Sequence, residues 1–178
     1  MQVETKRLFL RDFVPEDASD LYEILGDEET MKYCEPAYDL AQTEKFLTDF
    51  CIGRHGGVAA VCRDSGKVIG YILFHEGEKG VYEIGWFFNR VYWGRGFAFE
   101  ACRAVIDYAF CRMGAHKVFA ETIDGGRSVR LMEKLGMKRE GVQRSQVKNP
   151  AGQWADLYLY GMLREEKEGV QGAGMTHE

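Results

Sequence analysis

The sequence has no surplus of positive charge and no long apolar run. Its 178 residues carry 23 lysines and arginines against 28 aspartates and glutamates, a formal net charge of −5. Nucleic-acid-binding domains usually show a basic surplus, so this balance argues against a general nucleic-acid binder. No apolar stretch approaches the roughly 18 residues of a transmembrane helix. Residues 1–6 lack the basic and then apolar pattern of a signal peptide. We expect a cytoplasmic chain that contacts no membrane.

Cysteine is scarce, odd in number and without the C-x-x-C spacing of zinc or redox sites. We therefore expect reduced thiols, as in other cytoplasmic proteins, and no metal site. The five residues are Cys34, Cys51, Cys62, Cys102 and Cys111.

The composition suits one globular domain. With 46% hydrophobic residues, the chain is long enough to bury a sizeable core. We place a single domain at residues 1–166. Residues 167–178 hold three glycines and little to bury, so we expect a flexible C-terminal tail.

The apolar spacing predicts a mixed α/β domain built on one sheet. Its order is β-α-α-β-β-β-α-β-α-β-β, which differs from a doubly wound dinucleotide fold. Pro15 and Asp39 each indicate the start of a helix, and the helix after Asp39 would bury Leu40. Residues 64–67 indicate a turn. Strands are expected at residues 7–11, 58–62, 68–74, 81–88, 116–122, 137–147 and 154–163, and helices at 15–25, 39–50, 97–110 and 128–135.

Residues 93–98 read Trp-Gly-Arg-Gly-Phe-Ala and join an expected strand to an expected helix. Two glycines let backbone N–H groups approach an anion closely where the helix dipole favours negative charge, and a pyrophosphate suits such a turn. A third glycine at the Rossmann position and a following Gly-Lys-Ser/Thr are both absent, which excludes those two phosphate motifs. A purely structural bend is the remaining alternative.

This turn resembles the acyl-CoA signature of the GNAT acetyltransferases, written Q/R-x-x-G-x-G/A. Gly96 and Ala98 fill its small positions, and Trp93 stands where Gln or Arg is usual, as in the RimJ/RimL-like branch. Residues 134–137 (Lys-Leu-Gly-Met) resemble the K-L-G-F of the family's second conserved helix, and residues 154–158 and 163–166 resemble the branch's C-terminal strand. The resemblance spans roughly residues 3–165 and implies the GNAT acyl-CoA acyltransferase fold.

The resemblance also implies where acetyl-CoA binds. Backbone amides of the turn would hold the pyrophosphate, with the Arg95 side chain adding charge or remaining solvated. The strand at residues 84–88 would bind the pantetheine arm where it separates from the strand at 118–122. One backbone N–H there would polarise the thioester carbonyl. The expected cofactor-binding residues are Ile84, Trp86, Phe87, Trp93, Gly94, Arg95, Gly96, Phe97, Ala98 and Ser128.

Removal of a proton from the amine requires a base. Glu83 is the first candidate, because family members place a glutamate on this strand, and a structural ion pair is the alternative. Glu35 is a second candidate or a solvated loop acid. Tyr33 and Tyr158, with Trp86, are candidates for lining the acceptor pocket, unless they serve the core. Histidine is a common proton-transfer residue, so His75 and His116 are further candidates, and we expect His75 to be structural or on the surface.

Fewer residues are candidates for the group that donates a proton or a hydrogen bond to the leaving thiolate. Family members often carry a tyrosine where this chain has Met132, which cannot donate a proton. In RimJ/RimL-like relatives a serine in an N-x-x-S pattern lies near the sulfur, and Ser128 matches it. The asparagine of that pattern falls on Gly125, so Asp124 or a backbone group would have to substitute. Tyr158 is a further candidate donor.

The expected activity is acetyl transfer from acetyl-CoA to a primary amine, by direct attack in a ternary complex. The acceptor is either a protein N-terminal α-amine or a small amine such as a polyamine, an amino acid or an antibiotic. A non-catalytic acyl-CoA-binding module is the alternative from another class. The resemblance leaves a homodimer open.

Overall fold

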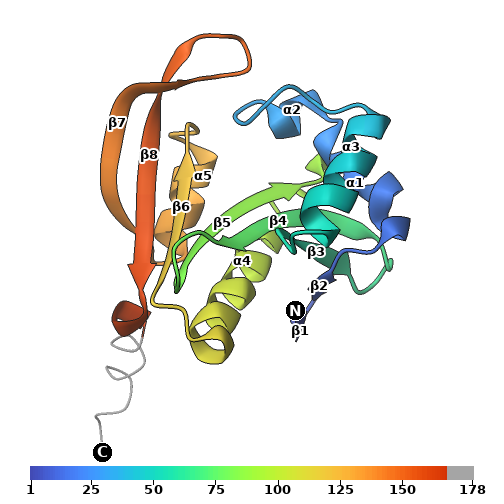
Figure 1. Cartoon of the computed structure of the whole chain (residues 1–178), viewed down its shortest axis with the longest axis horizontal. Coiled ribbons are helices and arrows are strands. Elements are labelled where there is room, and N and C mark those ends of the chain that lie inside the picture. Colours follow the sequence, from blue (N-terminus) through green and yellow to red (C-terminus); the bar gives the residue numbers. More distant parts are fainter. Residues whose placement is uncertain (168–178) are drawn as a thin grey trace, which may run out of the picture.

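In a computed structural model, whose described part is residues 1–167, one eight-stranded sheet runs through the molecule (Figure 1). The strand order is β1-β2-β3-β4-β5-β6-β8-β7. The strands are β1 (Gln2–Glu4), β2 (Leu8–Asp12), β3 (Gly57–Cys62), β4 (Val68–Glu76), β5 (Val81–Phe88), β6 (Lys117–Thr122), β7 (Lys138–Lys148) and β8 (Trp154–Leu163). The helices are α1 (Ala18–Leu25), α2 (Glu28–Met31), α3 (Leu40–Phe46), α4 (Phe97–Tyr108) and α5 (Arg127–Lys134).

The sheet separates two hydrophobic cores. Tyr82, Ile84 and Phe88 of β5 pack in the core that includes α4 and α5, whereas Phe87 packs in the core under α1. Successive strand residues point to opposite faces, so this alternation puts Glu83 on the same face as Phe87. β5 therefore presents apolar side chains to the core that includes α4, and the Glu83 carboxylate to the opposite face of the sheet.

β5 and β6 are parallel neighbours that separate soon after they begin. Their pairing covers only Val81 with Lys117, Tyr82 with Val118 and Glu83 with Phe119. Beyond Glu83, β5 remains paired with β4 as far as Phe88, and β6 remains paired with β8 as far as Thr122. Backbone polar groups need partners, so the separated edges are suited to a ligand that forms strand-like hydrogen bonds.

Most expected elements are confirmed with small shifts in their ends, but three details differ. The three-residue β1 and the one-turn α2 were not expected, because neither is long enough to show a period. Leu40 is 47% exposed rather than part of the buried face. Asp39 does cap α3, accepting a hydrogen bond from the Gln42 N–H at 2.7 Å, so Leu40 lies in the first turn and faces solvent.

Three findings bear on the expectations from composition. All five cysteines are free thiols, and no helix within residues 1–167 has the length and apolarity to cross a membrane. The same range holds no cluster of three or more His, Cys, Asp or Glu side chains suited to a metal ion. The expected tail, apart from Lys167, lies outside the described residues.

Candidate functional site

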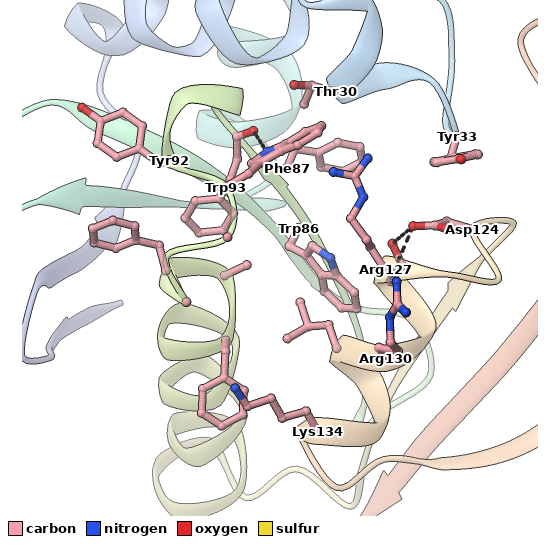
Figure 2. A pocket seen from close by; sticks show the side chains of 18 of the residues that line it. Thr30, Tyr33, Trp86, Phe87, Tyr92, Trp93, Asp124, Arg127, Arg130 and Lys134 are labelled. Carbon is pink, nitrogen blue, oxygen red and sulfur yellow. Dashed lines mark hydrogen bonds between the residues drawn. The ribbon is translucent and has the colours of Figure 1, made fainter.

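A pocket of about 500 Å³ lies where the end of β5, the first turn of α4 and one face of α5 meet (Figure 2). It gathers nine of the expected cofactor-binding and acceptor-pocket residues, whereas Glu83, Ile84, Arg95, Glu35 and Tyr158 lie outside its lining. The nine are Tyr33, Trp86, Phe87, Trp93, Gly94, Gly96, Phe97, Ala98 and Ser128.

The glycine turn has the backbone conformation that its sequence requires. Gly94 and Gly96 have φ angles of 72° and 79°, in the left-handed region that side chains disfavour. Gly96 is the N-cap of α4, and no side chain in the described structure caps that helix. The first N–H groups of a helix lack intrahelical partners, so these amides are available to an anion. Ile84, by contrast, is only 1% exposed as a whole residue, packs in the core that includes α4 and does not line the pocket.

An ion pair from the far edge of the sheet braces this turn. The Arg7 guanidinium donates to the Arg95 carbonyl at 2.8 Å and to a Glu100 carboxylate oxygen at 2.7 Å. Glu100 also accepts from the Thr5 hydroxyl and the Arg7 N–H. Burial alone would raise the pKa of Glu100, but these hydrogen bonds lower it overall. No local sequence pattern predicted this brace, because Arg7 and Arg95 are 88 positions apart.

Trp93, the unusual residue of the signature, forms one wall of the pocket. Its indole N–H donates to the Phe88 carbonyl at 2.7 Å, which satisfies the last carbonyl of β5. The Arg127 guanidinium lies 4.3 Å from the centre of the Trp93 ring, and its Nη2 lies 3.7 Å from Oε1 of Glu29. These contacts link α2, the glycine turn and α5 across the pocket. Arg95 itself lies over the Tyr92 and Phe97 rings.

Ser128 begins α5 and is held by Asp124. One oxygen of Asp124 accepts from the Ser128 N–H at 3.0 Å and from its hydroxyl at 3.1 Å, and the other accepts from the Gly126 N–H at 2.9 Å. Burial would raise the pKa of Asp124, but the hydrogen bonds lower it overall. Local amides thus occupy both oxygens of Asp124, which accepts hydrogen bonds at the start of α5, while Gly126 holds the N-cap position.

The glycine at the asparagine position has a local steric reason. A Cβ at Gly125 would lie 3.0 Å from the Tyr158 hydroxyl oxygen and 3.2 Å from the ring carbon that bears it. Tyr158 therefore occupies the space that a larger side chain at position 125 would need. Met132, at the position of the family tyrosine, is fully buried in the core beside α4 and does not reach the pocket.

We expect Asp124→Ala to lower the free energy of unfolding by about 1–2 kcal/mol at pH 7, comparable to the loss of a helix-capping side chain, because Asp124 accepts from the Gly126 and Ser128 N–H groups at the start of α5. Because the folded-state pKa of Asp124 is lowered, its stabilisation is complete above the ordinary value of 3.8 and is lost as pH falls through the folded value. Urea unfolding across this range checks the prediction, with Asp64→Ala on an exposed turn as control. A deficit that stayed constant into acid would contradict it.

Glu83 lies at the last pair before β5 and β6 separate, on the face opposite α4. Its side chain is 24% exposed, and one carboxylate oxygen lies 3.6 Å from Nε2 of His75. Burial raises the pKa of Glu83, the nearby Glu121 raises it further, and His75 lowers it. His75 is thus a neighbour of the candidate base, and its Nδ1 is buried with no partner in the described structure.

The second candidate base is located elsewhere. Glu35 lines a separate pocket of about 420 Å³ against α3, together with Tyr38, Phe46 and Phe50. Tyr33, two residues earlier, is 42% exposed and lines the main pocket. Residues 33–35 therefore connect the two pockets along the chain, but only Tyr33 lies beside the glycine turn.

The sequence and the fold have close counterparts among known proteins. A family model described as acetyltransferase (GNAT) domain matches residues 7–138. The uncharacterized N-acetyltransferase YnaD of Bacillus subtilis (strain 168) is 36% identical, over 93% of this chain and 99% of that protein. The crystal structure of a GNAT-family acetyltransferase from Bacillus anthracis is 31% identical with a TM-score of 0.87, covering 93% of this chain and 100% of that one.

Two more distant structures share the fold alone. One is a ribosomal-protein-S5-alanine acetyltransferase from Vibrio fischeri, with 16% identity and a TM-score of 0.78 over 93% of this chain and 98% of that one. The other is a spermidine N-acetyltransferase from Vibrio cholerae in complex with CoA and spermine, with 19% identity and a TM-score of 0.79 over 91% of this chain and 98% of that one. Because the family model matches most of the chain and YnaD matches nearly all of it, the chain belongs to the GNAT family of N-acetyltransferases.

Proposed function

We propose that this protein transfers the acetyl group of acetyl-CoA to a primary amine by direct attack in a ternary complex. The observation that carries the proposal is the separation of β5 from β6 beside an uncapped, glycine-led helix. In this assignment the amides of residues 95–98 hold the pyrophosphate, and the free edge of β5 beyond Glu83 binds the pantetheine arm. The left-handed Gly94 and Gly96 support it, because they leave the approach to these amides open.

Glu83 is the proposed base. The amine nitrogen forms a bond to the thioester carbonyl carbon, the C–S bond breaks, and the amine proton passes to the Glu83 carboxylate directly or through water. Its raised pKa brings the carboxylate closer to the value that suits a base at neutral pH. An N–H of β5 beyond Glu83 would stabilise the oxyanion that forms on the carbonyl oxygen.

Ser128 is the proposed partner of the departing sulfur. Its hydroxyl donates to Asp124, so it must turn that proton toward the sulfur when the thiolate forms. A thiol has a pKa near 8.5 and leaves readily, so this hydrogen bond contributes less to the rate than the base does.

We expect Ser128→Ala to lower kcat by about tenfold, which is below the usual range for general acid catalysis because the thiolate is a good leaving group. The dissociation constant for CoA should change little, as measured by calorimetry. Ser65→Ala, on a remote turn, is the control and should leave both quantities unchanged. A loss confined to CoA affinity would assign Ser128 to cofactor binding alone.

For the acceptor we propose a protein or peptide α-amine first, as in the RimJ/RimL-like branch, with which the chain shares Trp93. The distant ribosomal-protein-S5-alanine acetyltransferase has the same fold and is consistent with this choice. An α-amine has a pKa near 8 and needs little help in losing its proton.

A small polyamine is the second candidate, and the neighbouring carboxylates favour it. Glu83 and Glu121 lie close enough for one to raise the pKa of the other, and two carboxylates suit an acceptor that carries a second positive charge. The fold neighbour from Vibrio cholerae acts on spermidine.

Thiol release from acetyl-CoA, measured with a panel of N-terminal peptides, polyamines, amino acids and aminoglycosides, tests both candidates. Turnover limited to peptides supports the α-amine, and turnover limited to polyamines supports the second candidate. CoA binding without turnover on any member would replace both with a non-catalytic acyl-CoA-binding module.

A further inference from the structure

One face of α5 lines the pocket and carries three cations. Arg127, Arg130 and Lys134 are spaced by three and four residues, so they share a face of the helix, and all three line the pocket (Figure 2). The opposite face carries Met132, which is 0% exposed in the core. The helix therefore presents a row of positive charge, the α5 cationic row, to the pocket.

The α5 cationic row faces the first turn of α4. Nζ of Lys134 lies 4.6 Å from the centre of the Phe99 ring, the third residue of α4. From Arg127 to Lys134 the row spans seven residue steps, about 10 Å along a helix. It thus extends along the pocket wall well beyond the turn assigned to the pyrophosphate.

The row has little negative charge to balance it. The only acidic residues among those that line the pocket within the described chain are Glu29 and Asp124. Glu29 lies near Arg127, and local amides occupy both oxygens of Asp124. Across residues 1–167, Arg130 and Lys134 have no carboxylate within 4.0 Å of their charged nitrogens, although both are exposed. These two charges are free to bind an anion.

We propose that Arg130 and Lys134 bind the phosphate monoester on the ribose of CoA and make the site selective for CoA over its 3′-dephospho form. The inference rests on the proposed function, since it concerns the same cofactor. Backbone amides of one helix terminus suffice for the pyrophosphate. The ribose phosphate carries a charge between −1.5 and −2 near neutral pH and needs cations of its own, which the row supplies on the adjoining wall.

Arg127 is not one of the two proposed phosphate ligands, because it also supports the pocket wall. Its guanidinium covers the Trp93 ring and lies near Glu29, so its removal would disturb the pocket wall as well as the charge. Arg130 and Lys134 support no such contact with Trp93 or Glu29, which makes them the residues to test.

The test compares dissociation constants for CoA and for 3′-dephospho-CoA by calorimetry. Wild-type protein should bind CoA tighter by a factor on the order of ten to a hundred, as charge-assisted hydrogen bonds to a phosphate imply. The Arg130→Ala/Lys134→Ala variant should lose this preference while its affinity for 3′-dephospho-CoA stays unchanged. Arg112→Ala removes an exposed charge beyond the other end of α4, and it should leave both affinities as in wild type.

Equal binding of the two cofactors by wild-type protein would overturn the proposal, and so would a variant that loses affinity for both to the same extent. The conservative Arg130→Gln/Lys134→Gln variant, with its thermal unfolding recorded, distinguishes lost charge from lost folding. Failure of the proposed function gives other results: either neither cofactor binds to any of the proteins, which removes the CoA site, or CoA binds without turnover on any acceptor, which leaves the test of Arg130 and Lys134 intact.

Discussion

Gly96→Asp is expected to weaken CoA binding by more than about a hundredfold. The substitution puts a carboxylate at the N-cap of α4, where the pyrophosphate would lie. Two unit charges about 4 Å apart repel by roughly 4 kcal/mol at an effective dielectric constant of 20. The space itself is open, since the nearest atom to a Cβ at this position is Nη2 of Arg7 at 3.6 Å. Calorimetric titration with CoA measures the loss.

Gly96→Asn is the matched control for this variant. Aspartate and asparagine are nearly equal in size, and both tolerate the left-handed conformation that Gly96 adopts at φ 79°. The asparagine variant should therefore retain CoA affinity within a few-fold, which isolates the effect of the charge. If the two variants bound CoA equally well, the phosphate would have to bind at another place.

Glu83→Gln is expected to lower kcat by at least about a hundredfold, the usual contribution of a general base. Its affinity for CoA should not change, because Glu83 does not line the pocket at the glycine turn. Steady-state kinetics with the best acceptor of the panel, together with CoA titration, test both statements. Glu78→Gln, in the exposed loop before β5, is the control. Wild-type turnover in Glu83→Gln would remove Glu83 from the mechanism.

The pH profile gives a second test of the same residue. A carboxyl group accepts a proton from the amine only above its own pKa, so kcat/KM should fall as pH drops through the raised value of Glu83. Glu121→Gln removes a charge that raises this pKa, and the acid limb should move to lower pH. His75→Gln removes a lowering influence and should move the limb to higher pH. Two shifts in the same direction would contradict the assignment.

Much of the fold followed from local patterns in the sequence. The apolar spacing predicted a strand at residues 81–88, and β5 covers this range, with Ile84 buried in the core beside α4. Asp39 and the two glycines of the turn also have the local conformations that they predict. The short β1 and α2 escaped notice because a few residues cannot show a period.

The site was less predictable, because its parts meet only in three dimensions. The glycine turn carries its own signal, whereas the Arg7 brace comes from near the N-terminus, 88 positions away in the sequence. Likewise, Arg130 and Lys134 look like solvated charges in the sequence, and only the packing of α5 beside α4 brings them to the pocket. Gly125 looked like a missing contact, and Tyr158 supplies the steric reason for it.

A crystal structure of the protein with CoA tests the central claim most directly, because it locates the pyrophosphate and the sulfur at once. The pyrophosphate is expected on the amides of residues 95–98, the pantetheine arm along β5 beyond Glu83, and the sulfur near the Ser128 hydroxyl. CoA bound away from the α4 turn, or with its thiol on the far side of α5 from Ser128, would contradict the account.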